Sequence, residues 1–287
     1  MKIVIWGHKL YSHTSSYVHA GFYKAFKYMG YDTFWFDDND DVSSFDFSNC
    51  LFITEGQVDK KIPKIKGSLY LLHNCDINQY NNMVHLALAM YINPNKENKK
   101  LFGYDDYAVT MCWATDLLPV EIDENKNYNN KNLNNIYWVG SKAGGIFGNI
   151  DELNPFIEKA KTKGKNFIHS CPWTSPISFE QNLKLIRESF LAPTIVGTWQ
   201  KNNGYVPCRI FKNISYGKIP LTNSPEIKRI FGDMVIFNDD TAQLFLDGEE
   251  KLNTINNYDM VEVIKYVKNN HTYVNRATLI LEAFDLL

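Results

Sequence analysis

The segment Gly204–Leu221 reads GYVPCRIFKNISYGKIPL and carries the signals of a loop, a helix and a strand in direct succession. Pro207 suits the first turn of a helix, because the N–H group that proline lacks has no helical partner there. Gly217 is a typical helix stop, so we expect a helix over Pro207–Tyr216 and a strand over Ile219–Thr222. Alternating helices and strands are typical of an α/β fold with parallel sheets.

The start of this helix has the chemistry of a phosphate site. A helix N-terminus offers unpaired N–H groups and the positive end of the helix dipole, and both attract anions. Arg209 adds a forked donor that can hold two phosphate oxygens. Lys212 follows about one turn later on the same side of the helix. Together these groups predict a binding site for a diphosphate.

The same segment resembles the donor-binding region of glycosyltransferases of the GT-B fold, where a helix and a Gly-x-x-Pro-x strand hold a nucleotide sugar. Tyr205–Asn213 is similar to the Tyr-Val-Thr-Glu-Lys-Leu-aromatic-basic-Asn run of α1,3-fucosyltransferases, with Arg209 at the phosphate-binding Lys and Cys208 replacing the Glu. Group-one glycosyltransferases and CgeB-like proteins have a Glu where this chain has Lys212. The resemblance implies a donor site in the C-terminal half, an acceptor site in the N-terminal half and no required metal.

Strand and helix patterns alternate through the rest of the chain. Short apolar runs predict strands at 3–6, 33–36, 50–54, 68–72, 107–113, 136–139, 166–169, 193–196 and 234–237. Apolar spacing of the helical kind predicts helices at 17–29, 153–162, 179–190, 225–231 and 260–268. Ser15 and Ser16 are candidate caps of the first helix, and His85–Met90 also resembles a buried helix.

The polar, Asn-rich stretch Glu121–Asn135 separates the two halves and is expected to be a linker. We therefore predict an α/β protein with two Rossmann-like parallel-sheet domains that face a cleft. Residues 1–130 would form the acceptor domain and residues 131–287 the donor domain, with the last helix packing back on the first domain.

Composition restricts the classes of partner and compartment. The 287 residues include 30 Lys and Arg and 32 Asp and Glu, and the resulting net charge of -2 predicts no nucleic-acid partner. No apolar run approaches the ~18 residues of a membrane span, so no integral membrane segment is expected. The N-terminal apolar run is too short for a signal peptide. The five cysteines form no C-x-x-C pair, which predicts reduced thiols and a cytoplasmic location.

Several enzyme signatures are absent from the sequence. The first strand is not followed by the G-x-G-x-x-G pattern of dinucleotide-binding enzymes. The sequence also has neither the G-x-x-x-x-G-K-[ST] loop of ATPases nor the G-x-S-x-G elbow of α/β-hydrolases. These absences disfavour a nicotinamide or flavin enzyme, an ordinary ATPase and an α/β-hydrolase. The resemblance to GT-B enzymes implies that the nucleotide sugar is a co-substrate and that no other cofactor and no metal are expected.

Ligands of open α/β sheets bind beyond the carboxyl ends of the strands, and this rule selects the donor-binding candidates. They are Tyr205, Val206, Arg209, Lys212 and Asn213 in the deciding segment, Gly140, Ser141 and Lys142 after one strand, and His169 at the end of another. Two alternatives stay open: Gly140 can serve only as a turn after its strand, and His169 can have a purely structural role.

A transferase that inverts the sugar needs a base to take the proton of the acceptor hydroxyl. Glu55, Asp76 and His13 follow predicted N-terminal strands and are candidates for this role, with helix capping as the alternative for the two carboxylates. His8, which is also a candidate base, Ser12 and Ser15 are expected to contact a glycan or another hydroxyl acceptor. Two other functions remain open, namely a non-catalytic GT-B relative that binds glycans or nucleotides, and a sugar-nucleotide epimerase.

Overall fold

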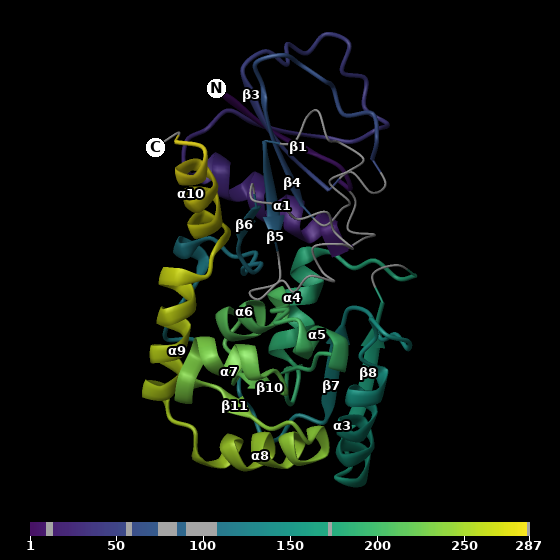
Figure 1. The fold of residues 1–287 in the computed structure, drawn as a ribbon. Coiled ribbons are helices and arrows are strands. Elements are labelled where there is room, and N and C mark those ends of the chain that lie inside the picture. The colour runs from purple at the N-terminus through teal and green to yellow at the C-terminus, as the bar shows by residue number, and fades with distance from the viewer. Residues whose placement is uncertain (10–13, 56–58, 74–84, 90–107, 172–173, 286–287) are drawn as a thin grey trace.

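The computed structural model describes residues 1–9, 14–55, 59–73, 85–89, 108–171 and 174–285. Within these residues every strand pairing is parallel. One sheet lies in the N-terminal half of the chain, and the remaining strands lie in the C-terminal half (Figure 1). The predicted α/β class with parallel sheets is therefore confirmed.

The N-terminal sheet has six strands in the order β2-β1-β3-β4-β5-β6. They are β2 (Thr33–Phe36), β1 (Lys2–Trp6), β3 (Cys50–Thr54), β4 (Leu69–His73), β5 (Leu86–Ala89) and β6 (Ala108–Thr110). Because β1 pairs with both β2 and β3, and β3 with β4, the carboxyl ends of these strands share one edge of the sheet. The residues that follow β1, β3 and β4 are thus brought together.

Helices cover one face of this sheet and aromatic side chains the other. Helix α1 (Thr14–Tyr28) ends before Gly30, whose φ of 87° is a conformation that favours glycine. It packs against α10 (Tyr273–Ala283), the last helix of the chain, in one hydrophobic cluster with the sheet. On the opposite face, Trp6, Phe52 and other aromatic residues form a second cluster. The C-terminal helix is therefore part of the core around the N-terminal sheet.

The C-terminal half has two smaller sets of strands. One pairs β7 (Asn135–Val139) with β8 (Asn166–Ser170), and the other has the order β11 (Ile236–Phe237), β10 (Leu221–Thr222) and β9 (Pro193–Thr194). The backbone N–H of Phe190 donates to the carbonyl of Asn135 at 2.7 Å, which links the start of β7 to the segment that enters β9.

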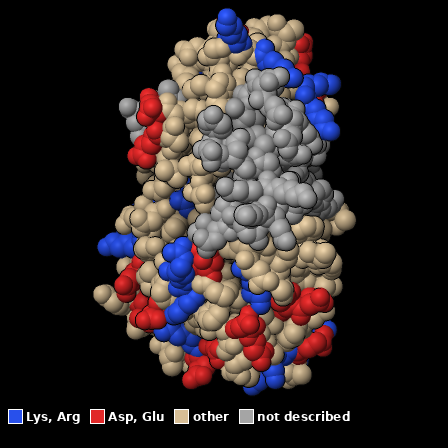
Figure 2. All heavy atoms as spheres, viewed as in Figure 1, with Lys and Arg blue, Asp and Glu red and all other residues tan. Residues whose placement is uncertain are grey.

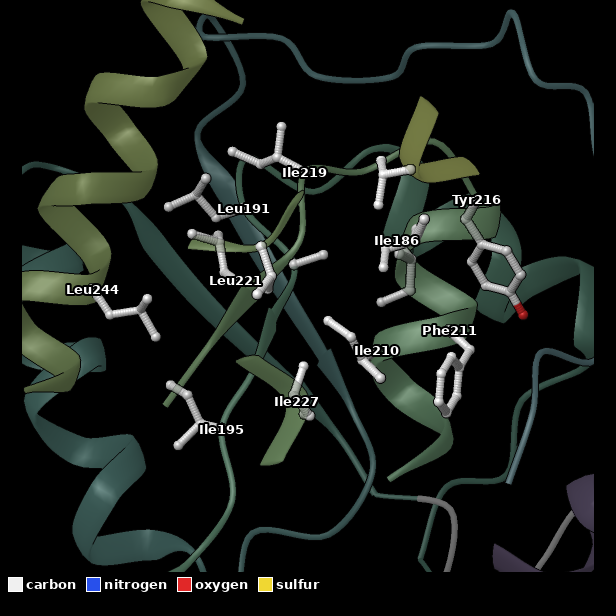
Figure 3. Close-up of a cluster of buried hydrophobic side chains, with 14 of the residues drawn as sticks. Ile186, Leu191, Ile195, Ile210, Phe211, Tyr216, Ile219, Leu221, Ile227 and Leu244 are labelled. Atoms are coloured by element: carbon white, nitrogen blue, oxygen red, sulfur yellow. The ribbon is translucent and has the colours of Figure 1, made fainter. Parts of the chain in front are cut away.

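Helices pack around these strands over a large apolar core. They are η2 (Pro119–Glu121), α3 (Ile150–Thr162), α4 (Phe179–Arg187), α5 (Thr198–Asn202), α6 (Cys208–Ser215), α7 (Pro225–Phe231), η3 (Gly232–Met234), α8 (Thr241–Thr254) and α9 (Asn257–Asn270). Figure 3 shows Ile210 and Phe211 of α6 pointing into this core beside Ile227. The same packing leaves the other side of α6 for the site described below.

Two sequence predictions need correction, and helix α5 was missed. The segment His85–Met90 is not a helix, because Leu86–Ala89 forms strand β5 between β4 and β6. A short apolar run has no detectable period, so only its pairing partners decide between the two structures. Helix α1 begins at Thr14, which places Ser15 and Ser16 inside its first turn instead of at its cap.

The Asn-rich stretch between the two halves packs against the C-terminal strands. The Asn129 side chain accepts a hydrogen bond from the backbone N–H of Ile219 at 2.9 Å and donates to the Gly217 carbonyl at 3.2 Å. The ammonium of buried Lys218 donates to the Tyr128 carbonyl at 2.8 Å. This stretch is therefore held in place by side chains. The boundary after residue 130 stays a prediction.

Candidate active site

A cavity of about 400 Å³ lies between the end of β7 and the start of α6. Its walls come from β7 and the loop after it, from α4, α5 and α6, and from Tyr17 of helix α1. Six of the nine predicted donor-binding residues line it: Gly140, Ser141, Tyr205, Arg209, Lys212 and Asn213. The structure thus brings residues from two distant segments of the sequence around one cavity.

Helix α6 points its N-terminus toward this cavity. Pro207 is the N-cap and makes no side-chain cap hydrogen bond, so the first N–H groups of the helix are not capped by that residue. Pro207, Cys208 and Arg209 all line the cavity. The buried side chains Ile210 and Ile214 fix which side of the helix faces it. This arrangement suits the phosphate groups of a ligand.

Arg209 lies in the cavity wall against Trp138. Its guanidinium carbon is 3.7 Å from the centroid of the Trp138 ring, which is cation–π geometry. Burial lowers the pKa of Arg209 to about 10, so the side chain remains charged at neutral pH. No carboxylate of the described residues forms a salt bridge with it. Arg209 is therefore a cation available to an anionic ligand.

Gly140 allows the arginine to occupy this position. A Cβ atom on residue 140 would lie 2.3 Å from Nη2 of Arg209, and the residue has a φ of 140°. The φ value favours glycine, and a Cβ atom would in addition displace the guanidinium from its present position. The glycine after β7 thus serves the cavity as well as the turn.

Lys212 has a different environment. Its Nζ lies 2.9 Å from Oδ2 of Asp116, and the Tyr216 hydroxyl donates to Oδ1 of the same carboxylate at 2.6 Å. Burial opposes the charge on Lys212, but the attraction of Asp116 outweighs it and raises the pKa of the ammonium. Lys212 is thus paired with a carboxylate, whereas Arg209 has no carboxylate partner among the described residues. Phosphate binding by the two cations stays a prediction.

The other donor candidates lie around the cavity or away from it. Asn213 lines it but also donates from Nδ2 to the Ala192 carbonyl at 2.8 Å, which is a structural bond. Val206 is buried in the core. His169 is exposed, with its Nε2 2.8 Å from the Gly140 carbonyl oxygen, and Lys142 is not among the lining residues. His169 thus acts on the turn at Gly140 instead of lining the cavity.

The sequence prediction missed several lining residues. Trp138, Phe147, Asn182 and Gln200 contribute aromatic and amide groups to the cavity, and Phe147 packs edge-on against Trp199 at 4.7 Å. Their sequence context is a strand, a loop and two helices without any motif. Among these residues, only Trp138 could have been predicted from the sequence, because it lies at the end of a predicted strand, just before the turn at Gly140.

Some of the predicted bases and acceptor contacts in the N-terminal half lie in the described part of the structure and others do not. Glu55 is fully buried at the end of β3, and its Oε1 lies 2.7 Å from Nε2 of His8, which follows β1. Ser15 lies in the first turn of α1. Ser12, His13 and Asp76 lie outside the described residues. Glu55 therefore faces a histidine and not open space, which changes the role expected of it.

The described part of the chain contains neither a metal-binding cluster nor a membrane-spanning helix. There, no group of three His, Cys, Asp or Glu side chains is arranged to hold a metal ion. None of the described helices combines the length and the apolar composition needed to cross a membrane. The independence from metal stays a prediction.

Comparison with known proteins gives matches in structure alone. No family model and no curated protein sequence matches the chain. A DNA-modifying β-glucosyltransferase, solved with and without its substrate uridine diphosphoglucose, matches 100% of both chains with a TM-score of 0.61 at 13% identity. An α-glucosyltransferase in complex with UDP-glucose and DNA containing an abasic site matches 100% of this chain and 98% of its own, with a TM-score of 0.64 at 11% identity.

The chain has the GT-B fold. The match extends over the whole length of both partners, so it covers both halves of the molecule and not just the donor-binding segment. The more detailed likeness of Tyr205–Asn213 to fucosyltransferases and CgeB-like proteins remains a resemblance of sequence. The descriptions of these GT-B neighbours name DNA, a partner class that the balanced net charge did not predict.

Proposed function

We propose that this protein is a glycosyltransferase that transfers a hexose from a nucleoside-diphosphate sugar to a hydroxyl group, without a metal ion. The observation that carries the proposal is the position of Arg209. It lies at the start of α6 in a cavity of about 400 Å³, stacked on Trp138 and without a described carboxylate partner. A cation and a helix N-terminus together stabilise the diphosphate that leaves when the sugar is transferred.

UDP-glucose is the first donor to test, because structural neighbours are described with it or with UDP.

The acceptor we propose is a hydroxyl group on a modified base in DNA. Two observations support this choice. The neighbours are described as modifying DNA or holding it, one of them with an HMU base. Four exposed lysines also stand close together after β3: Lys60, Lys61, Lys64 and Lys66. Figure 2 shows basic side chains gathered at the end of the molecule that holds the N-terminal sheet.

The donor site is tested with Arg209→Ala. We expect UDP-glucose to bind the variant about tenfold to a hundredfold more weakly, because a charge-assisted hydrogen bond contributes ~1.5–3 kcal/mol. Isothermal titration calorimetry measures the affinity. The matched control is Arg229→Ala, which removes an exposed arginine paired to Glu226 and should leave the affinity unchanged. Equal affinity of wild type and Arg209→Ala would place the donor elsewhere.

The class of reaction is tested by the products. Wild-type protein is incubated with UDP-glucose and with duplex DNA that contains or lacks a 5-hydroxymethylated pyrimidine. Transfer gives free UDP and a glucosylated base in the modified duplex alone. An epimerase would instead return a nucleotide sugar of changed configuration, and a binding protein would return the donor intact. Transfer to an oligosaccharide and not to DNA would keep the transferase and reject the DNA acceptor.

A further inference from the structure

A buried carboxylate and a histidine meet at the edge of the N-terminal sheet, outside the donor cavity. Glu55 follows β3 and has no exposed surface, while the His8 side chain, which follows β1, is 14% exposed. Oε1 of Glu55 lies 2.7 Å from Nε2 of His8. A buried carboxylate that holds one nitrogen of an imidazole fixes the tautomer and the orientation of the ring.

The backbone of His8 is held in a conformation that a side chain rarely adopts. Its φ is 26°, and Gly7 before it has a φ of 123°. The N–H group of His8 donates to Oδ2 of Asp59 at 3.0 Å, and Oδ1 of Asp59 accepts from the N–H of Asp38 at 3.0 Å. Such backbone strain persists only where surrounding contacts fix it, and it is concentrated at functional sites. The position of the imidazole is therefore imposed by its neighbours.

Two more histidines lie beside this pair. His19 of α1 has its Nδ1 2.8 Å from the Gly7 carbonyl oxygen and its Nε2 3.1 Å from Nε2 of His73. Burial lowers the pKa of His19 to about 4 and that of His73 to about 3, so both are neutral at neutral pH. The hydrogen bond with Glu55 raises the pKa of His8, with smaller contributions from Asp59 and Asp37. Of these three histidines, His8 is therefore the one whose pKa is raised, while the pKa values of the other two are lowered by burial.

His8 lies on the path from β1 into α1, the helix whose Tyr17 lines the donor cavity. The carboxyl end of a parallel sheet is also where α/β proteins bind their ligands. The pair therefore stands at the carboxyl edge of the N-terminal sheet, and the chain runs from this edge into the helix that reaches the donor cavity with Tyr17.

We propose that His8 is the catalytic base of the transfer and that Glu55 is its positioning residue; this inference rests on the proposed function. Nδ1 of His8 takes the proton of the acceptor hydroxyl while that oxygen forms a bond to the anomeric carbon. The bond from the anomeric carbon to the diphosphate oxygen breaks, and its electron pair leaves with the nucleoside diphosphate. Glu55 stabilises the imidazolium formed at His8, which then releases the proton to water. A single displacement of this kind inverts the anomeric carbon.

The test measures kcat for transfer from UDP-glucose to a duplex with a 5-hydroxymethylated pyrimidine. If no duplex reacts, the rate of UDP-glucose hydrolysis by water is measured instead. We expect His8→Gln to lower kcat by about 10²–10⁴-fold, the usual effect of losing a general base, while UDP-glucose binds as in the wild type. His85→Gln is the control, since this exposed histidine accepts from the Tyr70 N–H and stacks on the Tyr70 ring. Retained kcat in His8→Gln overturns the assignment, as does a product of retained configuration.

Glu55→Gln separates positioning from a merely structural role and also decides the case if His8→Gln does not fold. Removal of the carboxylate should lower the pKa of His8, so the rise of kcat with pH should move to lower pH. A structural role for Glu55 would lower activity without moving this rise. If the wild type transfers glucose and the pH profile of kcat is the same in Glu55→Gln, the roles of His8 and Glu55 are rejected while the proposed function stands. Wild-type protein that binds and cleaves no nucleotide sugar rejects the proposed function, and the assignment with it.

Discussion

Arg209 and Lys212 stand one turn apart on α6, yet their charges face different partners. Arg209 stacks on Trp138 of β7, whereas Lys212 is paired with Asp116, which also accepts from Tyr216. Asp116 lies between β6 and η2 in the chain and is not among the residues that line the cavity. The charge of Lys212 is therefore balanced by a residue that lies far from Gly204–Leu221 in the sequence.

At the same scale, buried histidines predict that the fold loses stability in acid. The folded-state pKa values of His19, His73 and His271 are lowered by burial to about 4, 3 and 3. The unfolded chain therefore binds more protons below the ordinary value of 6.5, so stability is full above that pH and falls as the pH drops. His8 acts in the opposite direction, because its pKa is raised.

We expect the free energy of unfolding to fall between pH 7 and pH 5, by ~2 kcal/mol for each histidine with a strongly lowered pKa. Urea unfolding at pH 8, 7, 6 and 5 measures the change. His271→Gln carries no titrating group and should make the dependence shallower. Equal stability at pH 8 and pH 5 would contradict the lowered pKa values.

At the scale of elements, helices α1 and α10 pack closely against each other. A Cβ atom on Gly21 of α1 would lie 2.2 Å from the Tyr273 ring of α10, closer than any packed carbon atoms. The ring of Tyr273 also packs edge-on against Phe22 at 4.9 Å. Gly21 therefore sets the distance between the two helices that cover the N-terminal sheet.

Gly21→Ala should destabilise the protein by about 1–3 kcal/mol, the cost of overpacking a core. The sign of the change in the free energy of unfolding is informative, because alanine in an isolated helix is more favourable than glycine by ~1 kcal/mol. Thermal and urea unfolding measure the effect. Gly144→Ala is the control, since its Cβ would meet the side chain of Ile150 at an ordinary 3.7 Å. A more stable Gly21→Ala variant would show that α10 is free to move away from α1.

On the scale of the whole molecule, Arg276 ties the end of the chain to its middle. This buried side chain of α10 donates to the carbonyls of Cys112 at 2.7 Å, Trp113 at 3.1 Å and Asn270 at 3.0 Å. A backbone bridge between Thr115 and Thr272 lies next to these bonds. The segment that leaves β6 and the helix that returns to the N-terminal sheet are therefore held together.

Arg276→Met should lower the free energy of unfolding by about 2–5 kcal/mol, because it leaves several buried carbonyls without donors. Differential scanning calorimetry and urea unfolding measure the loss. Lys265→Met changes an exposed residue whose Nζ is 3.9 Å from Glu124 and should alter stability by less than ~0.5 kcal/mol. Wild-type stability of Arg276→Met would mean that water satisfies these carbonyls and that the tie is not needed.

The amino-acid sequence alone determined most of the strands, the helix that follows Pro207 and the position of Arg209 at its start. Those features are local: apolar period, a proline at the first turn and a glycine stop act over a few neighbouring residues. The same holds for Gly140, whose turn follows directly from the end of β7.

Only the tertiary structure decided how distant groups are paired. The Asp116 carboxylate on Lys212, the imidazole of His8 on Glu55 and the strand at Leu86–Ala89 all depend on which segments become neighbours. A residue's charge, accessibility and pKa follow from these neighbours, because burial and the nearest ion act over a few ångströms of space and not of sequence. Arg209, Lys212, His8 and Glu55 were therefore visible as residue types in the sequence, whereas their partners became visible only in the fold.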